Sequence, residues 1–226
     1  MTIHFQYGEK EIEHLKKADK KLAIIIDQIG IIERATNPDL FTALVHSIVG
    51  QQISTKAHET IWERMQNKLR EITPAVIDSL TLEELQQCGI SFRKAAYIKS
   101  VAEKILRNEF DINALHSMSD EEVCVKLSEL NGIGVWTAEM LMIFSMQRSN
   151  ILSYGDLAIH RGLRMVYRHR KIDKTKFNKF WKRYAPYASV ASLYLWAVAG
   201  GAIDELKDCT PKKQNDKYGN RKRNIL

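Results

Sequence analysis

Leu130-Asn-Gly132-Ile-Gly134-Val-Trp136-Thr-Ala138 is the stretch of the sequence that decides the fold. Two glycines one residue apart allow a turn with positive φ and a close approach of the backbone to a ligand. We expect Gly134 to open a helix, whose first amide N–H groups would lack internal partners and attract a phosphate. A purely structural turn is an equally ordinary use of this pattern. A nucleotide P-loop is disfavoured, because no Lys-Ser/Thr pair follows and no strand precedes.

Helical periodicity surrounds this hairpin. After Asp39, which we expect to start a helix, Phe41, Leu44 and Ile48 follow the spacing of one helix face. Further helices are predicted at 9–28, 54–69, 91–108, 119–127, 134–146, 175–184 and 188–198, with two short ones capped by Thr73 and Thr81. A second helix–Gly–helix pattern around Gly89 echoes the first. The sequence lacks useful strand alternation and has only 11 Gly and 4 Pro, so it predicts an all-α fold.

The charge of the chain gathers at its C-terminal end. The net charge is +7, and residues 207–226 hold seven Lys/Arg against two Asp. We predict a domain over residues 1–209 and a basic, disordered tail over 210–226. A cationic tail is consistent with attraction to nucleic acid and equally with a solvated end on a near-neutral domain.

The cysteines and the apolar residues limit which classes of protein the sequence can belong to. Cys88, Cys124 and Cys209 have no partners at metal-ligand spacing, so we expect no zinc site and no iron–sulfur cluster. The N-terminal residues form no apolar signal core, and no apolar run approaches the roughly 20 residues of a membrane span. We therefore expect a cytoplasmic protein with no membrane partner, nucleoid-associated in a bacterium or nuclear in a eukaryote.

Several linked motifs resemble one known family. Val49-Gly-Gln-Gln-Ile-Ser54, Gly89-Ile-Ser-Phe-Arg-Lys-Ala-Ala-Tyr97 and Ser153-Tyr-Gly-Asp-Leu-Ala-Ile-His-Arg-Gly162 accompany the hairpin in the same order. Over about 39–200 the chain resembles the helix-hairpin-helix (HhH-GPD) DNA glycosylases, in particular the DNA-3-methyladenine glycosylase II branch. The resemblance implies a two-lobed helical fold and a monomer acting on double-stranded DNA with a damaged base. It also implies removal of alkylated bases of the 3-methyladenine and 7-methylguanine type.

Asp156 is the predicted catalytic residue. From its position alone it is an N-cap for the following helix, and the resemblance assigns it the catalytic role. One carboxylate can suffice here. A base alkylated on a ring nitrogen carries positive charge and leaves as a neutral molecule, so no acid is needed. An ionised Asp can then stabilise the oxocarbenium-like sugar and guide water.

The resemblance also assigns the base pocket. Trp136 and Trp196 match aromatic pocket positions, although each could be an ordinary core residue. Met140 and Leu157 stand where the best-known bacterial member has Tyr, so the pocket is predicted to be less aromatic. Trp136 occupies the place of the Schiff-base Lys found in glycosylases that also cut the strand. It therefore predicts base removal only.

The DNA contacts follow from the same motifs. The hairpin residues Gly132, Ile133 and Gly134 are predicted to contact DNA. Gln52 or Ile53 is predicted to be the wedge that fills the gap left by the flipped base. Arg93 and Lys94 are predicted to contact phosphates. For Arg93 and Lys94 a solvated face is an equal alternative.

The resemblance implies one ion and no other cofactor. A structural Na⁺ or K⁺ would be held by the backbone carbonyls of Ser128, Leu130 and Ile133. Two other functions stay open, a non-catalytic helix-hairpin-helix DNA-binding module and a bifunctional glycosylase/lyase. The lesion range, with hypoxanthine and ethenoadenine as further candidates, stays open too.

Overall fold

The computed structural model describes residues 3–210, and the predicted basic tail lies outside this range from residue 211 on. Within it the regular secondary structure is helical apart from two short strands, as the predicted all-α fold requires. The elements are, in order, β1 (Ile3–His4), α1 (Glu9–Ala18), α2 (Lys20–Ile29), β2 (Ala35–Thr36), α3 (Leu40–Gly50), α4 (Thr55–Leu69), α5 (Pro74–Ser79), α6 (Leu82–Gln86), α7 (Phe92–Leu106), η1 (Ala114–Ser117), α8 (Asp120–Ser128), α9 (Val135–Phe144), α10 (Leu157–Tyr167), α11 (Lys174–Tyr184) and α12 (Ala188–Ala199). β1 and β2 form a short antiparallel pair.

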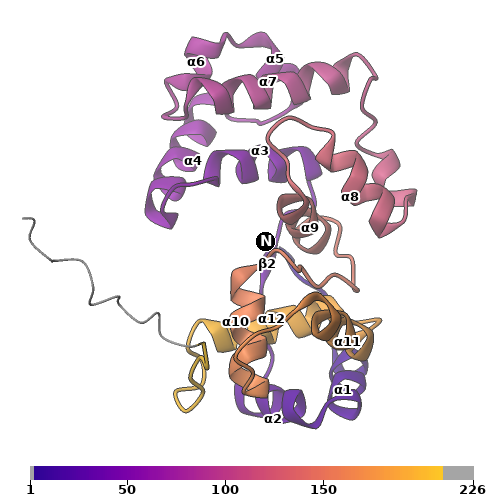
Figure 1. Cartoon of the computed structure of the whole chain (residues 1–226). Coiled ribbons are helices and arrows are strands. Elements are labelled where there is room, and N and C mark those ends of the chain that lie inside the picture. The colour runs from indigo at the N-terminus through magenta and orange to yellow at the C-terminus, as the bar shows by residue number, and fades with distance from the viewer. Residues whose placement is uncertain (1–2, 211–226) are drawn as a thin grey trace, which may run out of the picture.

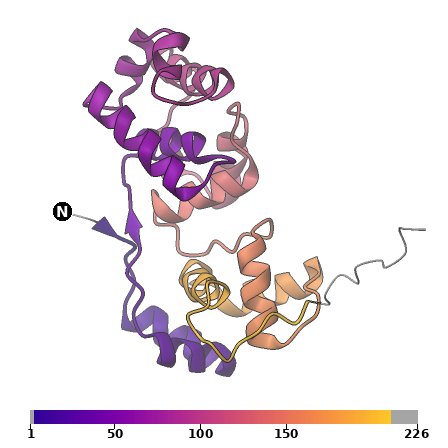
Figure 2. The ribbon, with the colours of Figure 1, turned by 90° about the vertical axis from the view of Figure 1, so that its left-hand side faces the viewer.

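The helices form two lobes (Figures 1 and 2). The hairpin lobe contains α3–α9, with α9 packed on α3 and α8. The terminal lobe joins both ends of the described chain, because α1 and α2 pack against α10, α11 and α12. The described chain starts with β1 beside β2 between the lobes, forms α1 and α2 in the terminal lobe, crosses to the hairpin lobe through β2 and returns between α9 and α10.

Side-chain caps begin most of the helices where the sequence predicts them. Ser54, Thr73 and Thr81 each accept a hydrogen bond from an amide N–H of the first turn. Ser119 and Glu122 form the predicted capping box of α8. Such caps fix helix starts because they satisfy amide groups that have no partner inside the helix.

The predicted helix at 9–28 is wrong, because two helices meet at Asp19. The Asp19 carboxylate caps α2 by accepting from the amides of Lys21 and Leu22, and it binds Arg183 of α11 at 2.6 Å. Burial raises the pKa of Asp19, but the Leu22 amide and Arg183 outweigh it and hold that pKa below its usual value. The partner Arg183 lies far away in the sequence, so helical periodicity could not reveal the break.

The two helix–Gly–helix patterns both fold as hairpins. α6 and α7 are joined through Gly89 and α8 and α9 through Gly132, and φ is +103° and +86° at these glycines. Positive φ is strained for residues with a side chain. Among residues 3–210 no helix is long and apolar enough to cross a membrane.

Gly162 allows α10 and α12 to pack closely in the terminal lobe. A Cβ at this position would lie 2.4 Å from the carbonyl oxygen of Leu195. We expect Gly162→Ala to lower the free energy of unfolding by about 1–3 kcal/mol, because backbone must move to make room. Thermal or urea unfolding measures this. Gly155→Ala is the control, since nothing lies within 4 Å of its Cβ position. Equal stability of the two variants would contradict the packing argument.

Candidate active site

Asp156 lies at the N-terminus of α10 with its side chain almost fully buried. Its Oδ1 accepts hydrogen bonds from the amides of Ala158 at 2.8 Å and Ile159 at 3.0 Å. This is the N-cap geometry that the sequence predicts. The cap fixes the carboxylate at the positive end of the helix dipole, a favourable place for negative charge.

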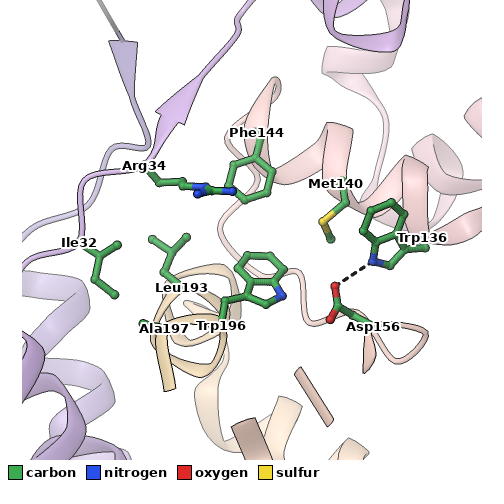
Figure 3. A pocket seen from close by; sticks show the side chains of 9 residues that line it. All are labelled: Ile32, Arg34, Trp136, Met140, Phe144, Asp156, Leu193, Trp196 and Ala197. Carbon is green, nitrogen blue, oxygen red and sulfur yellow. Dashed lines mark hydrogen bonds between the residues drawn. The ribbon is translucent and has the colours of Figure 1, made fainter. Parts of the chain in front are cut away.

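The second oxygen of Asp156 is bound by the other lobe. The indole N–H of Trp136, in the first turn of α9, donates to Oδ2 at 2.8 Å (Figure 3). Three N–H groups therefore hold the carboxylate, two from α10 and one from Trp136. Since about half of the Trp136 surface stays exposed, the indole is not a plain core residue.

A cavity of about 580 Å³ opens beside this carboxylate. Asp156, Trp136, Met140 and Trp196 line it, which brings together four residues that the sequence predicts for the site. In Figure 3 the Trp196 ring lies between Leu193 and the carboxylate of Asp156. The remaining lining residues are Ile32, Arg34, Phe144, Leu193 and Ala197.

Leu157 does not belong to this cavity, and its prediction as a pocket residue is corrected here. Its side chain is 85% exposed, and it is not among the lining residues. The reason is geometric. The cap turns the Asp156 side chain onto the end of α10, and the next residue points about 100° further round the helix.

Sequence reasoning missed five lining residues, and two of them carried a signal. Phe144 follows Met140 by four positions, and Leu193 precedes Trp196 by three, so each shares a helix face with a predicted residue. Ala197 comes directly after Trp196 and does not share its face. Ile32 and Arg34 lie in the non-helical segment between α2 and β2, where no period exists. The Arg34 guanidinium lies 5.5 Å from the centre of the Phe144 ring.

The hairpin and the predicted wedge segment lie side by side. The side-chain amide of Gln51 donates to the Gly132 carbonyl at 2.7 Å. A cavity of about 560 Å³ lies between them, and its lining includes Gln52, Gly134 and Trp136. Gln52 has φ of +57°, and Ile53 is 36% exposed and lines neither this cavity nor the one beside Asp156. The structure therefore places Gln52, rather than Ile53, next to the site.

The two basic residues of the first hairpin differ in their surroundings. Arg93 is exposed. Lys94 instead donates to the carbonyls of Val49 and Gln51, both at 2.7 Å, at the C-terminal end of α3. Burial lowers the pKa of Lys94. In this structure the ammonium group of Lys94 thus holds the segment before Gln52, and its contact with a phosphate stays a prediction.

The carbonyls predicted to hold a cation lie in the turn between α8 and α9. That of Leu130 accepts from the Ile133 amide at 3.0 Å. Within residues 3–210, those of Ser128 and Ile133 accept no hydrogen bond. Free carbonyl oxygens of this kind suit a hard cation. In the same range no three His, Cys, Asp or Glu side chains are grouped to hold a metal ion.

The sequence profile of one family covers the hairpin lobe and the loop that carries Asp156. It is described as "HhH-GPD superfamily base excision DNA repair protein" and matches residues 45–186, which contain both hairpins and Asp156. The chain therefore belongs to the HhH-GPD superfamily of base excision DNA repair proteins.

Relatives and solved structures agree with this family. The chain is 29% identical to DNA-3-methyladenine glycosylase 1 of Schizosaccharomyces pombe, over 94% of the chain and 100% of the relative. It is 30% identical to DNA-3-methyladenine glycosylase of Saccharomyces cerevisiae, over 76% and 70%. A crystal structure of DNA-3-methyladenine glycosidase from Bacillus halodurans matches with 35% identity and a TM-score of 0.80, over 90% of this chain and 95% of that one. The S. pombe 3-methyladenine DNA glycosylase in complex with abasic DNA matches with 28% identity and a TM-score of 0.69, over 85% and 97%.

The Trp136 indole should contribute through its N–H group as well as its ring. We expect Trp136→Phe to slow base release about 10- to 100-fold, because a hydrogen bond to a charged group is worth about 1.5–3 kcal/mol. Single-turnover release of 3-methyladenine from methylated DNA measures it. Trp196→Phe is the matched control, since its indole N–H donates to no residue among 3–210. Equal effects of the two changes would argue against a role for the indole hydrogen bond.

Proposed function

We propose that this chain is a monofunctional DNA-3-methyladenine glycosylase, which hydrolyses the bond between an alkylated base and its deoxyribose in double-stranded DNA. One observation carries the proposal: a buried carboxylate, held by three N–H groups, borders a cavity with two tryptophans in its lining. The names of the relatives from both yeasts support the same reaction.

The cavity fits a base that has left the double helix. An enzyme that cuts this bond inside a duplex must first rotate the nucleotide out of the stack. Trp136 and Trp196 then attract a cationic base through their rings, by roughly 1–2 kcal/mol when water is excluded. Arg34 is also cationic, but it is exposed, so solvent screens its charge.

Asp156 can promote cleavage without a second carboxylate. An alkylated base already carries the positive charge that a general acid would otherwise provide, and it departs with the bonding electrons as a neutral molecule. The sugar becomes positively charged, and a fixed carboxylate stabilises that charge without having to reorganise. Asp156 also accepts the proton of the attacking water, or orients that water toward the sugar.

The hairpin supplies the grip on DNA. The α9 N-terminus at Gly134 has open space beside it, since nothing lies within 4 Å of its Cβ position. A backbone phosphate fits there. The carbonyls of Ser128, Leu130 and Ile133 would hold a monovalent cation that adds positive charge near the phosphate, and Gln52 would fill the gap left by the flipped base.

The test of the reaction is Asp156→Asn. The amide oxygen still caps α10, but the negative charge is lost, so base release should fall by about 100-fold or more. Affinity for abasic-site DNA should stay, because the hairpin is unchanged. Release is followed by chromatography of free bases from methylated DNA. If the variant releases bases as fast as an active wild-type protein, the proposed role of Asp156 is wrong. If the wild-type protein itself only matches the spontaneous rate, a non-catalytic DNA-binding module is the better interpretation.

The absence of strand cutting is a separate expectation. A Schiff-base lyase needs an amine at the sugar's anomeric carbon, and Trp136 cannot provide one. Lys94, the lysine of the first hairpin, is held by two carbonyls. Borohydride added during turnover should therefore trap no protein–DNA adduct, and product strands should break only after hot alkali. A trapped adduct with breaks that keep pace with base release would establish a bifunctional enzyme instead.

A further inference from the structure

Glu139 is an acidic side chain near the catalytic loop that the proposed mechanism does not use. It lies on α9 three positions after Trp136, so the two side chains leave the same face of the helix. Glu139 is half-buried, and the hydroxyl of Ser153 donates a short hydrogen bond to its carboxylate. Trp136 and Glu139 thus reach from one helix to the two ends of the segment Ser153–Asp156.

Ser153 is the residue from which the catalytic turn begins. Its side chain is fully buried, and its carbonyl accepts a hydrogen bond from the Asp156 amide at 3.4 Å. A displacement of Ser153 would therefore be passed on to Asp156 through the backbone. Only two residues lie between them, which leaves little slack to absorb such a displacement.

Further hydrogen bonds of the loop, at residues 150 and 151, come from the terminal lobe. The Ile151 amide donates to the Ser189 hydroxyl at 2.9 Å, and the Trp181 indole donates to the Asn150 carbonyl at 3.0 Å. Within the described chain, residues 150–156 form two hydrogen bonds with the hairpin lobe, one with Glu139 and one with Trp136. These two bonds therefore set the loop against the helix that follows the DNA-binding hairpin.

We propose that Glu139 is a positioning residue, which through Ser153 sets the place of Asp156 relative to Trp136 and the base cavity. The inference rests on the proposed glycosylase function. A carboxylate that must face the sugar of a flipped nucleotide has to be placed against the lobe that grips the DNA. A misplacement of about 1 Å can cost about 100-fold in rate.

The electrostatics of Glu139 agree with this arrangement. Burial raises the pKa of Glu139, the hydrogen bond from Ser153 and the charge of Lys174 oppose that rise, and the negative charge of Asp156 adds to it. A half-buried carboxyl is costly unless it has a partner. Ser153 provides that partner, and the influence of Asp156 on this pKa places the two carboxylates in the same electrostatic environment.

The first test compares variants that remove or keep the acceptor. We expect Glu139→Ala and Ser153→Ala each to slow single-turnover release of 3-methyladenine about 10- to 100-fold, with unchanged affinity for abasic-site DNA. Glu139→Gln keeps an acceptor oxygen of the same reach and should stay within about 3-fold of wild type. The double variant should be no slower than either single one, because both remove the same bond.

A second readout needs no activity. The ¹⁵N-indole resonance of Trp136, assigned with Trp136→Phe, reports the bond to Asp156 in the free protein. It should shift in Glu139→Ala and Ser153→Ala and stay in place in Glu139→Gln. The indole resonance of Trp62, in the hairpin lobe, is the internal reference. Thermal melting identifies any variant that fails to fold, and Ser153→Ala then decides in place of Glu139→Ala.

The outcomes separate the two proposals. If folded Glu139→Ala or Ser153→Ala keeps both the wild-type rate and the Trp136 resonance, the positioning role is refuted. It is also refuted if Glu139→Gln loses as much rate as Glu139→Ala, because the charge rather than the hydrogen bond would then act. If the wild-type protein releases no 3-methyladenine, the glycosylase proposal fails, and the Trp136 resonance still decides whether Glu139 places Asp156.

Discussion

The geometry of the site rests on the hydrogen bond between the Trp136 indole and the Asp156 carboxylate. This bond joins the first turn of α9, in the hairpin lobe, to the first residue before α10, in the terminal lobe. A buried carboxylate without partners would be costly, and the two amides of α10 meet only part of that demand. The remaining partner comes from the other lobe, so the lobes must meet in one orientation for the site to form.

This constraint explains why cap and site coincide. An N-cap needs an acceptor oxygen at a helix start, and a glycosylase site needs a fixed negative charge beside a cavity. Asp156 meets both needs, because one oxygen caps α10 while the other faces Trp136 and the cavity. Asp19 is a useful contrast. It also caps a helix, but its second oxygen accepts from Arg183, so its charge is paired within the terminal lobe.

The two hairpins show that a local sequence motif does not determine by itself whether a ligand can bind there. At Gly89 an added Cβ would lie 2.8 Å from Arg64, whose guanidinium also donates to the Cys88 carbonyl. The turn at Gly89 is therefore filled by a neighbour from α4. The corresponding Gly132 is filled as well, because an added Cβ would clash with the Tyr97 ring of α7. The hairpins differ two residues later: the Ser91 hydroxyl caps α7, whereas Gly134 before α9 has no side chain and nothing lies within 4 Å of its Cβ position. Two similar sequences thus fold alike, and the packing around them leaves room for a phosphate at the second.

The sequence by itself predicted the helical class and most helix starts, because helical periodicity and side chains that cap the next turn are short-range causes. Asp156, Trp136, Trp196 and Met140 were predicted as site residues through the family resemblance, and the structure brings these four together around one cavity. Only the tertiary structure decided the break at Asp19, the exclusion of Leu157, the use of Lys94 to hold the end of α3, and the contributions of Arg34 and Glu139. Each of these depends on a contact between distant segments or on the direction in which a side chain leaves its helix, and neither is encoded in local spacing.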